Sequence, residues 1–415
     1  MSSEMHRKTL GDYFTLQRGT TYKSRLLGQP GPVLLGLATI QRNGGFRSDS
    51  LQTYGGESPD KLLVQPGDLY VSLKDVTQSA DLLGAVARLP LDHYAGRLTQ
   101  DTVKLQPRSS DTPIDYLYWL MRTPQYRSYC RAHATGTTNL GLAREDFLAF
   151  PALEPTPTQH TVVKALGAFD DKIELNRQMN ATLEALARAL FQSWFVDFDP
   201  VRARAAGRAP HGMDAATAAL FPDSFEESAL GEVPRGWKYE YMREVAQFIK
   251  GISYKSEHLQ NSHAALITLK SIGRGGGYQD EGLKPYTGEY KPQQQVRSGE
   301  IVVAHTDLTQ AAEVLGRPAL VREHSAFSTL IASLDLMIVR PSKAWMSNEF
   351  LYGLLSREEF REHSYGYSNG TTVLHLSVKA LPEYQFVLPH SSIVQAYTSR
   401  VRPLYKLFGL MSAQR

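Results

Sequence analysis

The chain repeats itself at a long interval, and this duplication constrains its fold more than any single motif. Residues Gly19–Ser24 have the sequence GTTYKS, and GISYKS recurs at Gly251–Ser256, an offset of 232 residues. At the same offset, Asp75–Gly84 (DVTQSADLLG) matches Asp307–Gly316 (DLTQAAEVLG), with six identities in ten positions and no gap. Each copy covers about 150 residues, whereas solenoid repeats have only ~20 to 50. The sequence therefore predicts two duplicated domains in tandem.

Two further matches keep the same order along the chain. Leu34–Phe46 (LLGLATIQRNGGF) corresponds to Leu266–Tyr278 (LITLKSIGRGGGY). After a slip of two residues, Gly136–Leu142 (GTTNLGL) corresponds to Gly370–Leu376 (GTTVLHL). The glycine clusters lack the strand, Gly-x-Gly-x-x-Gly and helix context of a dinucleotide site, so we interpret them as turns.

Both copies combine strand and helix patterns. Gly67–Leu73 and Gly299–His305 are short apolar runs bounded by turn residues, which is typical of strands. Asp115–Arg131 and Asn348–Glu362 carry apolar residues at helical spacing, each close to a Gly-Thr-Thr segment. We therefore expect an α+β fold in which each copy has a sheet with a few helices on it.

A different segment separates the copies. The run Thr158–Asp199 contains no proline, and its apolar positions alternate spacings of three and four, as in a heptad seam. A helix of this length is a rod of roughly 60 Å. We expect this seam to bind a partner helix or protein through Ile173, Asn176, Asn180, Leu183, Leu190 and Trp194. The alternative is an amphipathic helix on a domain surface. A shorter heptad pattern follows Pro389, and Pro403 should kink that second helix or mark its start.

Composition excludes several classes of protein. Of the 415 residues 42% are hydrophobic and 21% charged, which is ordinary for a globular protein. No apolar run approaches the ~20 residues of a membrane span, the N-terminus lacks a secretion signal, and the single Cys130 cannot form an internal disulfide. We expect a cytoplasmic protein. A net charge of +3 neither requires nor excludes a polyanionic partner.

Common catalytic signatures are missing from the sequence. There is no GxxxxGK[ST], His-Glu-x-x-His, Gly-x-Ser-x-Gly or Asn-Pro-Pro-aromatic motif. Asp170, Asp171, Asp197 and Asp199 are the carboxylates most able to bind a metal, but helix-surface and turn positions explain them better. We expect no catalytic residue, no metal and no cofactor.

The duplicated segments share polar side chains suited to DNA. Glutamine pairs with adenine edges, threonine contacts phosphate or a thymine methyl, and the glycines beside Arg42 and Arg274 let the backbone approach a partner closely. Any one of these short segments also closes turns or caps helices, and a shared framework is the alternative explanation. The candidate DNA-binding residues are Tyr22, Lys23, Arg42, Lys74, Thr77, Gln78, Thr137, Thr138 and Asn139 in the first copy, and Tyr254, Lys255, Arg274, His305, Thr306, Thr309, Gln310, Asn369, Thr371 and Thr372 in the second.

Three passages carry a family resemblance. They are Asp170–Asn180 (DDKIELNRQMN), Phe191–Val201 (FQSWFVDFDPV) and Leu230–Trp237 (LGEVPRGW). With them, the chain resembles the specificity (S) subunit of type I restriction-modification systems over nearly its whole length. The resemblance implies two target-recognition domains whose spacer helices pair as an antiparallel coiled coil. The implied limits are 1–157 for the first recognition domain, 158–199 for the central helix, 200–236 for a linker, 237–389 for the second recognition domain and 390–415 for a distal helix.

The resemblance also implies a function. Such a subunit is a non-catalytic reader of bipartite double-stranded DNA that binds methyltransferase (modification) subunits, two of them by family expectation, and recruits the restriction subunit. Adenine-N6 methylation with S-adenosylmethionine, and DNA cleavage, belong to those partners. The alternatives are a coiled-coil scaffold without DNA readout and the recognition module of a single-chain restriction enzyme. The distal helix is shorter than the family's usual one.

Overall fold

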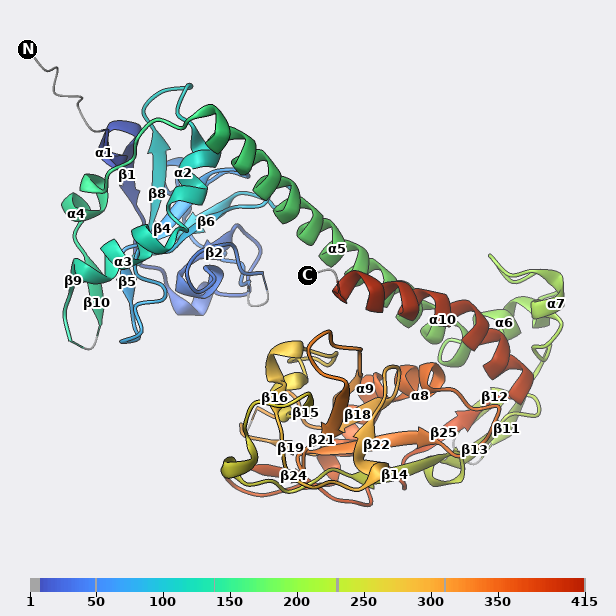
Figure 1. Ribbon diagram of the computed structural model, residues 1–415. Helices are drawn as coiled ribbons and strands as arrows, with labels where there is room; N and C mark the ends of the chain where they lie inside the picture. Colours follow the sequence, from blue (N-terminus) through green and yellow to red (C-terminus); the bar gives the residue numbers. More distant parts are fainter. Residues whose placement is uncertain (1–7, 49–50, 138, 229–230, 310, 414–415) are drawn as a thin grey trace, which may run out of the picture. The chain divides into compact units, whose positions relative to one another are not determined.

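The computed structural model describes residues 8–48, 51–137, 139–228, 231–309 and 311–413. It forms two compact units, Met1–Asp171 and Lys172–Arg415, so the boundary falls inside the long helix α5 (Pro157–Phe195). Both units mix helices with strands (Figure 1), which confirms the α+β class. The domain limits given by the resemblance remain predictions.

The first unit contains two sheets of strands from across its length, with short helices beside them. Its elements are α1 (Leu10–Tyr13), β1 (Phe14–Arg18), β2 (Val33–Leu35), β3 (Leu63–Val64), β4 (Leu69–Ser72), β5 (Lys74–Asp75), β6 (Val86–Arg88), β7 (Gly96–Leu98), β8 (Thr102–Pro107), α2 (Ile114–Leu120), α3 (Pro124–Ala132), β9 (Ala134–Thr135), β10 (Leu140–Leu142) and α4 (Arg144–Ala149), followed by the start of α5. A third, small sheet is formed by β5, β10 and β9.

The second unit follows the same plan with additions at its start and end. Its elements after α5 are α6 (Asp199–Ala205), α7 (Ala215–Ala218), β11 (Phe225–Ser228), β12 (Gly231–Pro234), β13 (Lys238–Tyr241), β14 (Ala246–Lys250), β15 (Ala264–Ile267), β16 (Lys284–Pro285), β17 (Gln295–Val296), β18 (Ile301–Ala304), β19 (Thr306–Asp307), β20 (Pro318–Leu320), β21 (Thr329–Ala332), β22 (Leu336–Pro341), α8 (Asn348–Leu355), α9 (Glu358–Gly366), β23 (Ser368–Asn369), β24 (Leu374–Leu376), β25 (Gln385–Leu388) and α10 (Ser391–Ala413).

Two sheets of each unit have the same topology, whereas β2-β7-β3 of the first unit corresponds to β16-β15-β21-β17, which has one more strand. The order β1-β8-β4-β6 corresponds to β14-β22-β18-β20, all antiparallel, and β5-β10-β9 corresponds to β19-β24-β23. The register also agrees, because Leu69 faces Leu105 in the first unit and Ile301 faces Val339 in the second. The duplication in the sequence is therefore a duplication of the fold.

The central strands show why the apolar runs form the cores. All four residues of β4 (LYVS) and all four of β18 (IVVA) are buried, and each strand lies between two neighbours in its sheet. A strand covered on both faces needs a nearly continuous apolar run, which both segments supply. These two strands confirm the predictions for 67–73 and 299–305.

The predicted helical stretches are each two helices. In 115–131 the break lies between α2 and α3, where Thr123 caps α3 and Pro124 takes its first position. Proline is favoured there, and it disfavours a helical conformation in the residue before it. In 348–362 the chain breaks at Arg357 without a proline, so the tertiary structure imposes the same break.

Helix α5 begins within one residue of the start of the proline-free run 158–199 and ends four residues before the end of that run. The side chains of Thr156 and Gln159 bond to each other's backbone N–H at the start, which is the arrangement of a capping box. The helix ends at Phe195, and Phe198 has a left-handed φ of +55°. Pro200 therefore lies in the first turn of α6 instead of ending α5.

The C-terminal part of α5 packs against α10 within the second unit (Figure 1). The ring of Tyr397 lies 6.1 Å from that of Trp194 and 5.1 Å from that of Phe195, centre to centre. Further along α10, Tyr405 lines the same cavity as Glu184, which is earlier in α5. The two helices therefore run antiparallel, as predicted, and Pro403 lies inside α10 instead of at its start.

No helix in the described residues is both long enough and apolar enough to cross a membrane.

Candidate functional site

A buried carboxylate organises the loop that follows β5. Asp75 ends this strand, and its side chain is fully buried. Its Oδ1 accepts hydrogen bonds from the backbone N–H of Thr77 at 2.8 Å and from the hydroxyl of Thr77 at 2.9 Å, and its Oδ2 accepts one from the N–H of Leu82 at 2.7 Å. Bonds to an ionised acceptor are among the stronger ones in proteins. The loop is therefore closed around one internal carboxylate.

The second unit repeats this loop in detail. Oδ1 of Asp307 accepts from the N–H of Thr309 at 2.8 Å and from its hydroxyl at 2.9 Å, and Oδ2 accepts from the N–H of Val314 at 2.8 Å. Ala80 and Ala312 occupy the same left-handed conformation, with φ of +54° and +49°. The hydroxyls of Thr77 and Thr309 donate inward, so both residues hold the shape of the loop.

Each loop lies beside the hairpin that contains the Gly-Thr-Thr segment, because β5 pairs with β10 and β19 pairs with β24. Gly136 and Gly370 turn the hairpins with φ of +97° and +114°. A Cβ there would lie 2.4 Å from the carbonyl oxygen of Asn139 and 2.1 Å from that of Val373. In the first unit Nε2 of Gln78 also donates to the carbonyl of Thr137 at 3.3 Å.

The structure thus gathers at one edge of each unit residues that lie about 60 positions apart in the sequence. Val76 and Leu308, which the sequence reasoning missed, are 62% and 68% exposed at equivalent positions, so each loop offers an apolar side chain to a partner. Thr138 and Gln310 lie outside the described residues. The other predicted side chains exposed at these edges are Thr77, Gln78, Thr137 and Asn139 in the first unit and Thr309, Asn369, Thr371 and Thr372 in the second.

The glycine-cluster turns adjoin the same loops. The backbone N–H of Asn43 donates to the carbonyl of Asp81 at 2.8 Å, next to the exposed Arg42. In the second unit Nε of Arg274 lies 3.2 Å from a carboxylate oxygen of Glu313, and its side chain is 80% exposed. Arg42 and Arg274 therefore belong to the loop clusters with the residues above.

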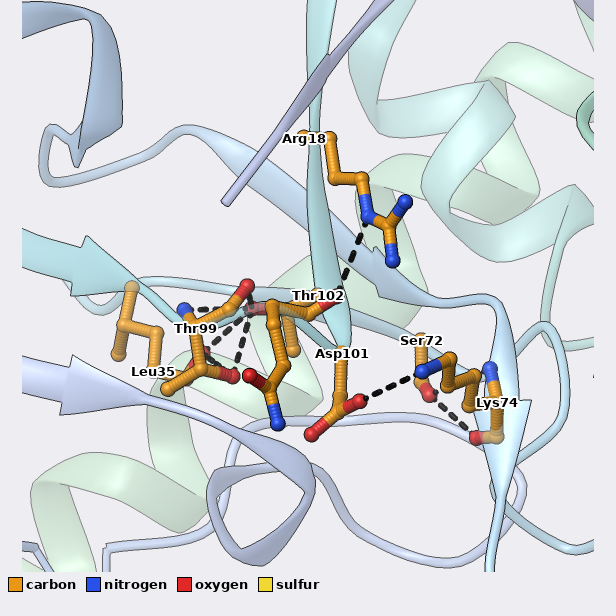
Figure 2. A network of polar contacts seen from close by, with 8 residues as sticks. Arg18, Leu35, Ser72, Lys74, Thr99, Asp101 and Thr102 are labelled. Carbon is orange, nitrogen blue, oxygen red and sulfur yellow. Dashed lines mark hydrogen bonds and ion pairs between the residues drawn. The ribbon is translucent and has the colours of Figure 1, made fainter. Parts of the chain in front are cut away.

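Beside the first loop, cations surround the turn between β7 and β8 (Figure 2). Nζ of Lys74 lies 3.2 Å from Oδ1 of Asp101, and Nε of Arg18 donates to the carbonyl of Gln100 at 3.4 Å. The hydroxyl of Thr102 fixes the turn by donating to the carbonyl of Leu35 at 2.6 Å. Figure 2 shows the rest of the Arg18 guanidinium without a partner among the residues drawn.

Arg18 was missed by the sequence reasoning, and so was its counterpart Lys250. Each cation ends a strand and immediately precedes a repeated glycine, which was the available signal. A Cβ at Gly19 or Gly251 would lie 2.0 Å from the carbonyl oxygen of Thr99 or its counterpart. Only glycine permits this approach, which holds the cation beside the turn.

The two predicted tyrosines each contact one residue of their own unit. Tyr22 lies edge-on to Tyr54, with ring centres 6.2 Å apart. Nζ of Lys284 lies 5.8 Å from the centre of the Tyr254 ring. The predicted lysines Lys23 and Lys255 are exposed.

Two predicted residues lie inside the second unit instead of on its surface. His305 and Thr306 are each 6% exposed, and the hydroxyl of Thr306 donates to Oδ1 of Asp335 at 2.9 Å. Burial, together with the charges of Lys250 and His375, lowers the pKa of His305 to about 4 against the opposing effect of Asp335. The first unit has Leu73 and the exposed Lys74 at these positions. The two clusters therefore share a framework but differ in charge and polarity.

The predicted partner face of α5 is largely occupied by the chain itself. Asn176, Asn180 and Trp194 are each no more than 4% exposed, while Ile173, Leu183 and Leu190 are partly exposed. Trp194 is in the core of the second unit, because α10 supplies the partner helix. Val162 and Phe169, nearer the start of the same helix, are 52% and 64% exposed.

Within the described residues no group of three or more histidine, cysteine or acidic side chains is arranged to hold a metal ion. Three of the four carboxylates considered from the sequence have other partners. Asp170 accepts from Arg122 at 3.2 Å, Asp197 from Gln192 at 2.9 Å, and Asp199 from a serine hydroxyl at 2.8 Å.

Comparison with known proteins finds relatives of one kind, although no family model matches the chain. The type I restriction enzyme HindI specificity subunit of Haemophilus influenzae is 24% identical over 292 residues, 60% of this chain and 61% of the relative. The MjaIX specificity subunit of Methanocaldococcus jannaschii is 22% identical over 304 residues, 70% of this chain and 62% of the relative. The chain is a homologue of type I specificity subunits. It spans about three-fifths of the length of these two specificity subunits.

A solved structure has the same fold. The S subunit of a type I restriction-modification system from M. genitalium superposes with a TM-score of 0.54 at 14% identity, covering 99% of this chain and 95% of that one. A type I S subunit therefore shares the tandem arrangement described above, and the resemblance inferred from the three sequence passages is confirmed.

Proposed function

We propose that this chain is the sequence-specific DNA-recognition subunit of a type I restriction-modification complex and that each unit recognises one block of a bipartite target. The observation that carries the proposal is the loop cluster built twice on the same framework. In each unit, a buried aspartate closes a loop beside a Gly-Thr-Thr hairpin and a glycine-rich turn. The kinship to specificity subunits supports the same function.

Each cluster offers the chemistry that base readout needs. The amides of Gln78, Asn139 and Asn369 pair with adenine edges, and the exposed arginines Arg42 and Arg274 pair with guanine. The apolar side chains of the two loops suit the thymine methyl group. Four exposed cations suit contacts to DNA phosphates: Arg18, Lys23, Lys250 and Lys255. Such contacts add binding affinity that falls as the salt concentration rises.

The two blocks should differ in sequence. Lys74 in the first unit is an exposed cation, whereas its counterpart Thr306 is buried and neutral. Side chains that differ at matching positions of one framework select different bases, so we expect an asymmetric target.

Catalysis belongs to other subunits in this proposal. Two modification subunits with S-adenosylmethionine would methylate adenine, and a restriction subunit would cleave DNA, while this chain holds no cofactor. The exposed apolar residues Val162 and Phe169 of α5 support a protein partner along this helix.

The test is to co-purify the full chain with its modification subunit and select duplexes from a random DNA pool at several salt concentrations. We expect two short blocks at a fixed separation and a steep loss of affinity with salt. Gln78→Ala should change selection in one block, and Asn369→Ala should change it in the other. An intact complex without enrichment would refute the proposal and favour the scaffold alternative. Cleavage or methylation by the chain alone would favour a single-chain enzyme.

A further inference from the structure

An arginine of α3 also holds the first loop, which Asp75 closes. Arg127 is 3% exposed, and its Nη1 donates to the carbonyl of Leu83 at 2.7 Å. Its Nη2 donates to the carbonyls of Ala80 and Asp81, both at 2.9 Å. A buried carboxylate thus holds the N–H groups of this loop, and a buried guanidinium holds its carbonyls.

The second unit has the same arginine in another position. Arg361 of α9 corresponds to Arg127, but its Nη1 donates to Oε1 of Glu358 at 2.6 Å. No bond from Arg361 to the loop 307–316 is present among the described residues of that loop. Glu358 stands where the first unit has Pro124, at the first position of the helix. Only the second unit therefore has a carboxylate one turn before the arginine.

A cavity lies where the guanidinium of the first unit is buried. Its volume is about 440 Å³, and Ala312, Leu315, Arg361 and Tyr365 are among the residues that line it. Ala312 and Leu315 correspond to Ala80 and Leu83, whose carbonyls bind Arg127. Arg361 therefore borders the space that its counterpart fills.

We propose that Arg361 is a positioning residue for the loop 307–316, with two alternative positions. One is the position on Glu358, which also lines the cavity, and in the other the guanidinium crosses the cavity and binds the loop carbonyls as Arg127 does. DNA bound to the loop favours the second position, so this inference rests on the proposed function. The side chains of Arg361 and Glu358 are 35% and 55% exposed, and ion pairs so exposed hold weakly. Breaking the ion pair between Arg361 and Glu358 therefore costs little free energy.

Hydrogen exchange on the free full-length chain tests the two positions without DNA. Glu358→Gln removes the competing carboxylate, so Arg361 should enter the cavity and slow amide exchange in 307–316 by up to about five-fold. The amides of Val314 and Leu315, which bond to Asp307, are the reporters. The double variant with Arg361→Gln should lose this protection.

The first unit supplies the reciprocal variant. Pro124→Glu places a carboxylate one turn before Arg127, at a helix start where glutamate is well tolerated, so exchange in 76–83 should become faster. Unchanged exchange in both Glu358→Gln and Pro124→Glu would overturn the proposal.

A binding experiment tests the DNA-linked position. With the duplex selected above and the co-purified complex, Arg361→Gln should weaken binding about ten-fold through the second block, and substitutions in the first block should keep their usual effect. Binding as tight as that of the unaltered complex would overturn the role of Arg361. If the unaltered complex selects no duplex, the proposed function fails, and the exchange experiment on the free chain still decides the two positions.

Discussion

Asp75→Asn is the substitution that tests most directly whether the repeated motif encodes a loop shape. An asparagine keeps one oxygen for Thr77 but turns an NH2 group toward the N–H of Leu82, which now bonds to Oδ2 at 2.7 Å. One charge-assisted bond is lost and a donor loses its partner, which costs about 2 kcal/mol. Asp75→Ala removes all three bonds to this carboxylate and should cost about 4 kcal/mol. Asp307→Asn should cost more than Asp75→Asn, since that carboxylate also accepts from Leu315 at 3.2 Å.

The assay is thermal unfolding of the full chain together with hydrogen exchange in residues 76–82. A loss of about 2 kcal/mol lowers the melting temperature of a unit of this size by about 4 to 8 °C. Asp101→Asn is the matched control, because its carboxylate is partly exposed and its ion pair with Lys74 contributes little. An unchanged melting temperature and unchanged exchange in Asp75→Asn would refute the reasoning.

Two further predictions concern Gly251 and His305 of the second unit, with Gly167 of the first unit as a comparison. Gly251→Ala would place a Cβ 2.0 Å from the carbonyl oxygen of Ser333, so it should lower stability by about 2 kcal/mol or more, whereas Gly167→Ala in α5, with nothing within 4 Å, should raise it by up to ~1 kcal/mol in the same denaturant titration. Burial, with Lys250 and His375, lowers the pKa of His305 to about 4 against the opposing effect of Asp335. The unfolded chain binds this proton near pH ~6.5, so the contribution of the neutral side chain is complete above that pH and is lost as the pH falls toward the folded pKa. Between about pH 7 and about pH 4 the natural chain should therefore lose about 3 kcal/mol more stability than His305→Leu, and parallel losses would contradict this.

The duplication made the tandem fold predictable, because residues that correspond in the two copies, with a slip of two positions between β6 and β8, also share strand register. The duplication did not show which of the shared residues stabilise the fold and which are available to contact DNA. Thr77 and Thr309 each follow an aspartate by two positions, a spacing typical of side-chain turns, and this signal favours a structural role. His305 follows the buried strand β18 in sequence, and its burial depends on segments distant in the sequence, among them β24, which pairs with β19.

The partner face of α5 was harder to predict for a different reason. A heptad seam indicates that a helix has a partner without identifying it. Trp194 is buried by Tyr397 and its neighbours in α10, which lie about 200 positions away in the sequence. Arg18 and Lys250 differ in residue type, so a search for identities did not find them. What they share is the position immediately before a repeated glycine, and the structure adds that this glycine lies in close contact with a neighbouring backbone.

In the two loops, the side chains that stabilise the fold are different from the side chains that are exposed to solvent. Asp75 and the hydroxyl of Thr77 act inward, whereas Val76 and Gln78 alternate with them and are exposed. Substitutions at such exposed positions usually change stability by less than about 0.5 kcal/mol. New outward side chains can therefore accumulate without bringing the unit near its stability threshold. The same scaffold can in this way acquire a new preference through a few neutral intermediates, each of them folded.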